Sequence, residues 1–259
     1  MNEKDLETLT KSLILPMEKA GELSIDTYEK GLKIQIKDDN SPVTNGDIEV
    51  NKILTKAIKE HTPSIPIISE ETVDLKVKNT NKVFWLIDPI DGTKEYIKGS
   101  DEYTLNIALI INGVPAIGLV GVPRKGRLFY AHGQENSFLL EKGKVKRLSS
   151  KKNSSRNEIV ALSSTETPSQ MIKEKLNNYK VKSIVKMASS YKFCVIANGE
   201  FDIYAARERA NEWDYAAGHA IASKSGSLIT TLEGEPFLYG KEDYKNPSIL
   251  ILRSKNLNA

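Results

Sequence analysis

An apolar run that ends in two acidic residues constrains this chain more than any other stretch. Residues 83–87 are hydrophobic, and positions 88–93 read Asp-Pro-Ile-Asp-Gly-Thr. The pattern predicts a buried strand, followed by a tight turn into a short helix. Asp88 and Asp91 would then lie close together, and two such carboxylates repel each other unless a proton or a cation lies between them. An ordinary Asp-Gly turn between two core elements is the alternative.

The chemistry of these positions favours a cation and a phosphate. Ligands that are all oxygen suit a hard cation, and magnesium is the expected one. Gly92 and Thr93 open the expected helix, where backbone N–H groups favour an anion such as phosphate. The chain has three histidines in no metal-ligand spacing, which disfavours a zinc site and a histidine-based nucleophilic triad. Carboxylates therefore have to carry any catalysis.

The composition is that of an ordinary globular protein. The 259 residues are 39% hydrophobic and 27% charged, enough for one large domain or two moderate ones. No apolar run approaches the roughly 20 residues that span a bilayer, and the chain does not open on a signal-peptide pattern. The single cysteine, Cys194, fits a reducing compartment, so we expect a cytoplasmic protein. A net charge of +3 is too small to indicate a nucleic-acid surface.

The first half reads as helices followed by strands. A helix is expected over 4–29, and Pro16 should kink it or divide it in two. A half-buried strand is expected at 32–37, a polar loop at 38–44 and a second helix at 45–58. The apolar residues 65–69 form a short strand that delivers Glu70 and Glu71 at its end, and a solvated loop covers 72–81.

An antiparallel sheet should follow the central stretch. The dipeptide Asn112-Gly113 joins the apolar segments 103–111 and 114–120, which is a strong signal for a two-residue hairpin. Residues 127–131 and 137–140 should continue this sheet.

The chain is expected to divide in two after the sheet. Residues 141–156 are rich in lysine, serine and asparagine without apolar periodicity, which predicts an exposed linker. We therefore expect an α+β subdomain over 1–145 that carries the metal site, and an α/β subdomain over 146–259 that completes it. An RNA-binding patch is the alternative for the basic run, but no aromatic residues lie among its lysines.

Beyond the linker, strands and helices alternate, which predicts α/β layering. The expected strands are 158–162, 181–185, 201–205, 228–231 and 248–252, and the expected helices are 168–178, 189–198 and 213–225.

Two further acids stand at the expected starts of helices. Asp214 follows Trp213 at the start of one helix, and Asp47 lies in the first turn of another. Each could be an ordinary capping or first-turn acid that the helix dipole favours. A functional role gains weight because Glu70, Asp88 and Asp91 need partners to complete a metal site.

In their order along the chain, these motifs resemble the inositol monophosphatase superfamily of lithium-sensitive, magnesium-dependent phosphatases. The motifs are Glu70-Glu71, the sequence at 88–93 and Trp213-Asp214-Tyr215-Ala216-Ala217-Gly218. Lys94-Glu95-Tyr96 is similar to the 3'(2'),5'-bisphosphate nucleotidase branch of the CysQ type, and segments 39–44, 189–194 and 212–221 also match that branch. The resemblance implies an α/β fold that is a layered αβαβα sandwich, with the active site between its two halves.

The resemblance also implies a role for each acid. The expected ligands of two or three magnesium ions are Glu70, Asp88, the Ile90 carbonyl, Asp91 and Asp214. Thr93, hydrogen-bonded to Asp47, would orient the attacking water and help to deprotonate it. The N–H groups of Gly92 and Thr93 would bind the phosphate. Glu71 would support the metal ligands or belong to a weaker third metal site.

Substrate contacts are implied by a different segment. In the nucleotidase branch, the Ser and Lys of the Ser-Ser-Tyr-Lys segment contact phosphate or ribose, which implicates Ser189, Ser190 and Lys192. Ser189 could instead cap a helix, and Lys192 could be a solvated charge. Relatives usually carry an arginine for the second phosphate where this chain has Ala206. Either a neighbour such as Arg207 replaces it, or the preference for a bisphosphate over a monophosphate is relaxed.

The resemblance predicts a phosphatase that removes the 3'-phosphate of adenosine 3',5'-bisphosphate, and by extension of 3'-phosphoadenylyl sulfate in sulfur assimilation. Direct attack by water is expected, because no residue is placed as a covalent nucleophile. An inositol monophosphatase or a broad sugar phosphatase is the alternative enzyme, and a non-catalytic metal- or nucleotide-binding protein is the alternative of another class. The expected partner is a small phosphorylated nucleotide. The protein would be a monomer or a homodimer, and peripheral association with the inner membrane is left open.

Overall fold

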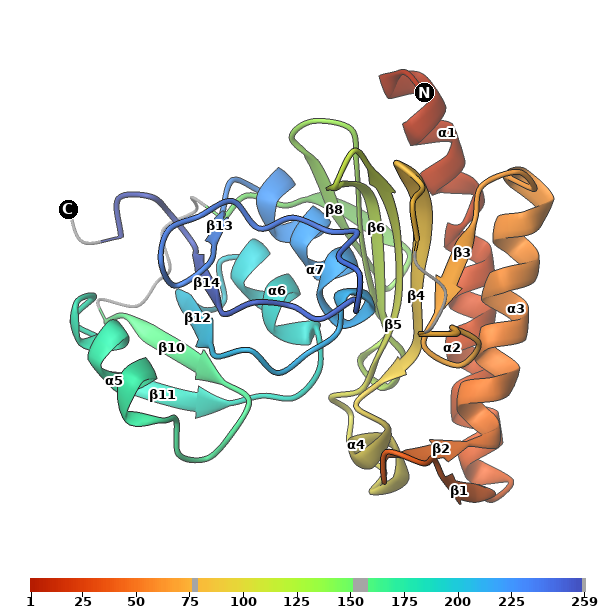
Figure 1. Ribbon diagram of the computed structural model, residues 1–259, viewed down its shortest axis with the longest axis horizontal. Coiled ribbons are helices and arrows are strands. Elements are labelled where there is room, and N and C mark those ends of the chain that lie inside the picture. The colour runs from red at the N-terminus through yellow and green to blue at the C-terminus, as the bar shows by residue number, and fades with distance from the viewer. Residues whose placement is uncertain (76–78, 151–157, 258–259) are drawn as a thin grey trace.

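The computed structural model describes residues 1–75, 79–150 and 158–257, and they form five layers. Figure 1 shows the N-terminal helices on one side, followed by the larger sheet, the helices between the sheets, the smaller sheet and an outer helix. The expected layered αβαβα arrangement is therefore confirmed. The expected loop at 72–81 and the expected linker each lie partly outside the described residues.

The outer helices at the N-terminal end are α1 (Glu3–Ser12), α2 (Ile14–Glu29) and α3 (Asn45–His61). The expected helix over 4–29 is divided at Leu13, three residues before Pro16. Pro16 thus falls in the first turn of α2, where a residue without an N–H group leaves no intrahelical hydrogen bond unmade. One face of each helix packs on the large sheet through buried side chains such as Leu6, Met17 and Leu54.

The large sheet has seven strands in the order β3-β4-β5-β6-β7-β8-β9. Their bounds are β3 (Ile67–Ser69), β4 (Val83–Asp91), β5 (Thr104–Ile111), β6 (Val114–Val122), β7 (Arg127–His132), β8 (Asn136–Glu141) and β9 (Lys144–Arg147). Among the described strands of this sheet, the β3–β4 pair alone is parallel. The expected hairpin at Asn112-Gly113 is confirmed, and both residues have the positive φ, 51° and 77°, that a type I′ turn requires.

Three sequence-based expectations are wrong in this half. The expected linker begins too early, because β9 (Lys144–Arg147) extends the sheet by pairing with β8, and all four of its residues are exposed. An edge strand exposed on both faces carries no apolar alternation for the sequence to reveal. The expected loop at 38–44 contains β2 (Pro42–Thr44), which pairs with β1 (Ile34–Ile36). The residues of β1 are exposed rather than half-buried.

The smaller sheet has five strands in the order β11-β10-β12-β14-β13. Their bounds are β10 (Val160–Ser163), β11 (Ser183–Lys186), β12 (Ile203–Ala206), β13 (Leu228–Thr230) and β14 (Ile249–Leu252). The helices of this half are α5 (Gln170–Asn177), α6 (Tyr191–Ala197) and α7 (Glu212–Lys224). The alternation expected from the sequence is thus confirmed. Among the described residues, no helix is both long and apolar enough to cross a bilayer.

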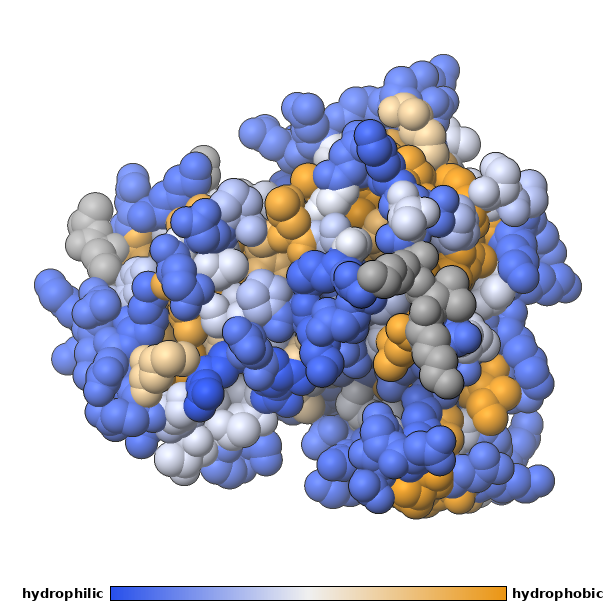
Figure 2. Space-filling view, in the orientation of Figure 1, coloured by the Kyte–Doolittle hydropathy of each residue, from blue (hydrophilic) through white to orange (hydrophobic). Residues whose placement is uncertain are grey.

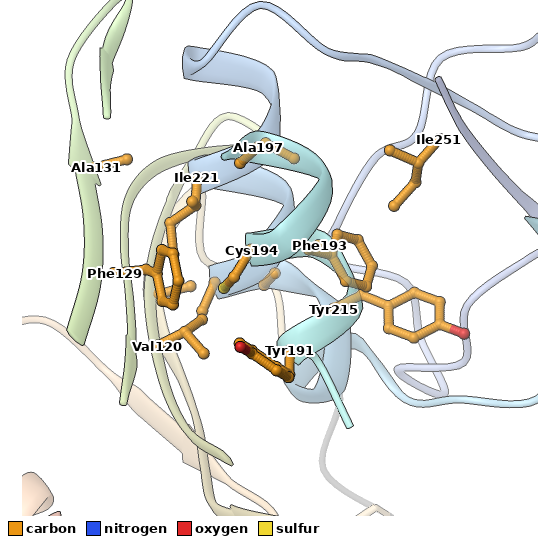
Figure 3. Close-up of a cluster of buried hydrophobic side chains, with 14 of the residues drawn as sticks. Val120, Phe129, Ala131, Tyr191, Phe193, Cys194, Ala197, Tyr215, Ile221 and Ile251 are labelled. Carbon is orange, nitrogen blue, oxygen red and sulfur yellow. The ribbon is translucent and has the colours of Figure 1, made fainter. Parts of the chain in front are cut away.

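Helices α6 and α7 join the two sheets through one hydrophobic core. Figure 3 shows Cys194 of α6 facing Phe129 and Val120 of the large sheet, whereas Phe193 lies beside Tyr215 of α7 and toward Ile251 of the smaller sheet. Glycine permits the close approach of α7 to the large sheet, since a Cβ at Gly118 would lie 2.5 Å from the Ala217 carbonyl oxygen. The tight packing fixes the start of α7 relative to the ends of β3 and β4.

Candidate active site

A bulge in β4 places two acids on the same face of the large sheet. Asp88 pairs with Asn106 of β5, and Asp91 pairs with Thr104, so three steps along β4 match two steps along β5. On a regular strand, residues three apart point to opposite faces. Because the bulge adds one residue to β4, the regular alternation of faces is broken between Asp88 and Asp91. Ile90 lies in the bulge and packs into the core beneath the N-terminal helices. Asp88 and Asp91 therefore both face the helices between the sheets.

Acids from three elements converge at this edge. Glu70 follows β3, Asp88 lies near the end of β4, and Asp214 lies in the first turn of α7. Each contributes a carboxylate oxygen to a group whose members all lie within 4.8 Å of one another. The parallel pairing of β3 with β4 brings Glu70 to Asp88, and the N–H of Glu70 donates to the Ile87 carbonyl at 3.1 Å. The sequence prediction that these distant segments meet is confirmed.

The acids in this group hold their protons more tightly than free carboxylic acids do. Burial raises the pKa of Asp88 and of Asp214 well above the usual value, and the neighbouring carboxylates add to the rise. Burial also raises the pKa of Glu70, against the opposing effect of Lys37. These directions show that full ionisation of the group needs positive charge between its members.

Asp91 stands beside this group and is held by the start of α6. Its Oδ2 accepts a hydrogen bond from the Ser190 N–H at 2.5 Å, and the Ser190 hydroxyl contacts Asn106 Oδ1 at 2.6 Å and Thr104 Oγ1 at 2.8 Å. Burial raises the pKa of Asp91, whereas the positive charges of Lys192 and Arg209 oppose the rise. The negative charge of Asp91 in turn helps to raise the pKa of Glu70, Asp88 and Asp214, so Asp91 lies close to the acidic group.

Asp47 and Thr93 form the hydrogen bond that the resemblance implies. Thr93 Oγ1 donates either to Asp47 Oδ1 or to the Ile90 carbonyl, each at 3.2 Å. Asp47 Oδ2 accepts from the N–H and hydroxyl of Thr44 at 2.8 and 2.6 Å, so Asp47 also caps α3 as the sequence allowed. Burial raises the pKa of Asp47 against these hydrogen bonds.

Gly92 and Thr93 begin the short helix α4 (Thr93–Ile97). Gly92 has φ 89°, a left-handed conformation that favours glycine. A larger residue there would be strained by this backbone conformation. The expected role of these two N–H groups in phosphate binding stays a prediction.

Lys37 is a site residue that the sequence did not reveal. It lies at the end of β1, and its ammonium forms ion pairs with Glu70 Oε1 at 3.2 Å and with Glu71 Oε1 at 2.9 Å. Burial works against its charge, but the two glutamates outweigh it and raise the pKa of Lys37. No local pattern could have identified it, because the contact depends on how the β1–β2 hairpin folds over the end of β3. Glu71 is accordingly an ion-pair partner of Lys37 beside the acidic group.

The expected substrate contacts have partners within the protein. Ser189 Oγ donates to the Glu102 carbonyl at 2.5 Å, and Lys192 donates to the carbonyls of Met187 and Ser189 at 3.2 and 2.5 Å. Ser190 and Lys192 are buried. These contacts hold the 187–190 segment against the Asp91 carboxylate, so any contact of the three side chains with substrate stays a prediction. Arg207 lies apart from them, exposed, at the end of β12.

The oxygen atoms of the acidic group suit a hard divalent cation. Both carboxylate oxygens of Asp88 are buried and have no hydrogen-bond partner among the described residues. Asp214 Oδ2 is bound by the Asn211 N–H at 2.8 Å, which leaves its other oxygen available. A buried carboxylate without a donor is costly unless a cation binds it. The group offers only oxygen atoms, the ligands that magnesium prefers.

The whole chain matches one family. The model of the Inositol monophosphatase family covers residues 5–257. The chain therefore belongs to the inositol monophosphatase family.

Within this family, the relatives include bacterial nucleotidases. The 3'(2'),5'-bisphosphate nucleotidase CysQ of Escherichia coli (strain K12) is 33% identical over 236 residues, which cover 90% of this chain and 94% of that protein. The protein of the same name from Buchnera aphidicola is 36% identical over 80% of this chain and 77% of its own length. The crystal structure of CysQ from Bacteroides thetaiotaomicron aligns with a TM-score of 0.77 at 31% identity, over 94% of this chain and 96% of that one.

Proposed function

We propose that the protein is a magnesium-dependent phosphatase that hydrolyses the 3'-phosphate of adenosine 3',5'-bisphosphate to give AMP and phosphate. The same activity would extend to 3'-phosphoadenylyl sulfate, a compound of sulfur assimilation. The observation that carries this proposal is the buried, unpartnered Asp88 carboxylate between Glu70 and Asp214, in a chain one-third identical to named bisphosphate nucleotidases.

The residues that would hold two or three magnesium ions are Glu70, Asp88, the Ile90 carbonyl, Asp91 and Asp214. When bound, the ions supply positive charge that stabilises the phosphate oxygens and the leaving oxygen and makes water a better nucleophile. Burial is the main reason why the pKa values of Asp88 and Asp214 are raised, and cations would remove the repulsion that adds to it. Glu71 shares its ion pair with Lys37, which also binds Glu70, and so would support the metal ligands from the edge of the site or belong to a weaker third metal site.

Thr93 and Asp47 would position the attacking water. A threonine hydroxyl has one proton. When Thr93 Oγ1 donates this proton in a hydrogen bond to Asp47 Oδ1, the Thr93 oxygen can accept a hydrogen bond from the attacking water. Thr44 fixes the other oxygen of Asp47 and so sets the direction of the pair. The N–H groups of Gly92 and Thr93 would hold the phosphate in line with this water.

The reaction needs no covalent intermediate. The water oxygen forms a bond to phosphorus as the bond from phosphorus to the 3'-oxygen breaks. The proton lost by the water passes toward the Thr93–Asp47 pair, and the 3'-oxygen leaves with a proton from solvent. Turnover in ¹⁸O-labelled water should label phosphate and leave AMP unlabelled, which tests cleavage at phosphorus. Trapping a phosphorylated residue during turnover would contradict direct attack by water.

A direct comparison of substrates tests the proposal. The purified protein with Mg²⁺ should release phosphate from adenosine 3',5'-bisphosphate faster than from inositol 1-phosphate. A clear preference for the inositol ester would favour an inositol monophosphatase. Absence of phosphate release from either ester or from sugar phosphates would indicate a non-catalytic binding protein.

Substitution of the acids locates the site. Asp91→Asn should abolish Mg²⁺-dependent turnover and leave the fold intact by circular dichroism. The matched control is Asp26→Asn, because Asp26 is an exposed aspartate on α2. Full activity of Asp91→Asn would show that the site lies elsewhere.

The setting of the enzyme also belongs to this proposal. We infer a cytoplasmic protein that acts on a small phosphorylated nucleotide, as a monomer or a homodimer. Gel filtration with light scattering measures the oligomeric state, and cell fractionation tests peripheral association with a membrane.

A further inference from the structure

The 187–190 segment leads from β11 into α6 and lies where the half with the smaller sheet meets the half with the large sheet (Figure 1). Figure 2 shows that the surface is notched between these two halves at the lower edge of the view. The N–H of Met187 donates to the Ser163 carbonyl at 2.9 Å, at the end of β10 in the smaller sheet. The N–H of Ser190 donates to Asp91 at the end of β4 in the large sheet. The segment therefore connects the smaller sheet with an expected metal ligand.

Ser189 holds a backbone conformation that is uncommon for its residue type. Its φ is 51°, in the left-handed region, where a residue with a Cβ is sterically disfavoured. Such a conformation persists where surrounding contacts fix it. Because Ser190 follows directly, the conformation of Ser189 sets the direction in which the Ser190 N–H points toward Asp91.

Glu102 provides two such contacts from the loop between α4 and β5. Its Oε2 accepts a hydrogen bond from the Ala188 N–H at 2.9 Å, and its backbone carbonyl accepts one from the Ser189 hydroxyl at 2.5 Å. The next residue, Tyr103, is fully buried, and its hydroxyl lies 2.7 Å from Ser24 Oγ of α2. Glu102 therefore belongs to a loop that the N-terminal half anchors, and it holds the segment from that side.

Lys192 binds the carbonyl groups of the segment, whereas carboxylates bind its N–H groups. The buried ammonium of Lys192 donates to the carbonyls of Met187 and Ser189 at 3.2 and 2.5 Å. The N–H group that follows each of these carbonyls donates to a carboxylate, that of Glu102 and that of Asp91 respectively. Both peptide groups are thus held at both ends by charged side chains, and hydrogen bonds to charged groups are stronger than those between neutral groups.

The hydrogen bond from Ser190 restricts the Asp91 carboxylate. A carboxylate that accepts a fixed N–H donor on one oxygen cannot rotate freely, so it keeps one orientation when a cation binds. Groups that orient a metal ligand without touching the metal commonly change metal affinity about 10- to 100-fold. The order of Asp91 as a ligand therefore depends on the position of the 187–190 segment.

We propose that Glu102 is a positioning residue for the metal site. It holds the 187–190 segment so that the Ser190 N–H orients the Asp91 carboxylate for Mg²⁺. This inference rests on the proposed function and adds to it a residue outside the acidic group. The half with the smaller sheet is thereby linked to the metal site through Asp91 as well as through Asp214.

Magnesium binding in the absence of substrate tests the proposal. In isothermal titration calorimetry with MgCl₂, Glu102→Ala should weaken Mg²⁺ binding about 10-fold, because it removes the acceptor for the Ala188 N–H. Glu102→Gln keeps an oxygen that can accept the same hydrogen bond, so its Mg²⁺ affinity should stay within about twofold of the wild-type value.

A neighbouring acid is the matched control. Asp101 is exposed and pairs with Lys125 at 2.5 Å, so Asp101→Ala removes the same charge one position away and should leave Mg²⁺ binding within about twofold of wild type. If Glu102→Gln weakens Mg²⁺ binding as much as Glu102→Ala does, the charge of Glu102 matters rather than its hydrogen bond, and the proposal is refuted.

A general loss of stability gives a different result. Glu102→Ala would then unfold at a lower urea concentration in EDTA while the folded protein binds Mg²⁺ as tightly as wild type, and this outcome overturns the proposal. If Glu102→Ala does not fold, Ser189→Ala removes the other contact with the Glu102 loop and should also weaken Mg²⁺ binding. Unchanged Mg²⁺ binding by that variant would count against the proposal in the same way.

Turnover distinguishes failure of this inference from failure of the proposed function. For Glu102→Ala, the Mg²⁺ concentration at half-maximal phosphate release should rise about 10-fold, a larger change than that in kcat. If turnover occurs and this concentration is the same as for wild type, the phosphatase stands and the role of Glu102 is refuted. If the wild-type protein binds Mg²⁺ but hydrolyses no phosphate ester, the proposed function fails and calorimetry still decides the role of Glu102. Absence of Mg²⁺ binding by the wild-type protein would overturn both.

Discussion

Replacement of Asp88 by asparagine should stabilise the metal-free protein while it abolishes activity. Asp88 is buried between Glu70 and Asp214, and both of its oxygens lack a donor. The amide that replaces the carboxylate carries no charge and can donate to a neighbouring carboxylate. Stability and function therefore oppose each other at this position.

The distances set the size of the effect. The oxygens lie within 4.8 Å of one another, and two unit charges at that separation repel by about 3.5 kcal/mol at an effective dielectric constant of about 20. Protonation limits the gain, because keeping a carboxylic acid of ordinary pKa 3.8 protonated at pH 7.5 costs at most about 5 kcal/mol, so a larger repulsion is relieved by proton uptake. We therefore expect Asp88→Asn to raise the free energy of unfolding by about 2 to 4 kcal/mol without metal.

The sign of the pH dependence follows from the raised pKa. Between the unfolded pKa of Asp88 and its higher folded pKa, the folded state binds more protons than the unfolded state. The metal-free protein should therefore lose stability as the pH rises through this window, and it should regain stability when Mg²⁺ is added. The asparagine variant should show less of both effects.

Urea unfolding in EDTA and in Mg²⁺, from pH 5 to pH 8, measures these changes. Asp26→Asn on the exposed face of α2 is the control and should change stability by less than about 0.5 kcal/mol. If Asp88→Asn is less stable than the wild-type protein in EDTA, or if Mg²⁺ stabilises both proteins equally, Asp88 is not part of a repulsive cation site.

Three further substitutions address other parts of the structure. Thr93→Ala should lower kcat about 100-fold or more with little change in stability, because it removes the hydroxyl bonded to Asp47, and Thr93→Ser should retain activity in a phosphate-release assay. Gly218→Ala should destabilise the protein by about 1 to 3 kcal/mol in urea, since its Cβ would lie 2.6 Å from the Phe193 ring; an unchanged midpoint would refute this packing. Burial lowers the pKa of His219 to about 3, so the unfolded state binds more protons below pH 6.5 and stability falls on acidification. Between pH 7 and 4.5 this histidine alone should cost about 2.5 kcal/mol, and His219→Gln should lose correspondingly less stability over that range.

The sequence predicted those parts of the site that lie within short motifs. The acids of the central stretch follow an apolar strand directly, and Asp214 stands at a recognisable helix start. The strands and helices were predicted from apolar patterns and turn signals, whereas the layered αβαβα arrangement was implied by the resemblance of the motifs to the family. The division into subdomains at residue 145 stays a prediction.

Residues that reach the site through tertiary contacts could not be predicted in this way. Lys37 directly follows the exposed strand β1, and its partners are 33 and 34 positions away. Arg209 lies in a polar loop with no periodicity of its own. The strand β9 is an exposed edge strand. The polar composition of this segment correctly predicted that it is exposed, but it did not predict that the backbone pairs with β8. Residues 151–156 of the expected linker lie outside the described part of the chain.

The position of α6 and α7 between the sheets has a consequence for the order in which the nascent chain can fold. The last described strand of the large sheet ends at Arg147, but the helices that pack on the apolar face with Val120 and Phe129 end at Ala197 and Lys224. At ordinary ribosomal rates, synthesis of residues 148–224 takes about 4 to 15 s. During this time the apolar face of the large sheet is exposed to solvent and can aggregate, so a holdase chaperone would bind the nascent chain there.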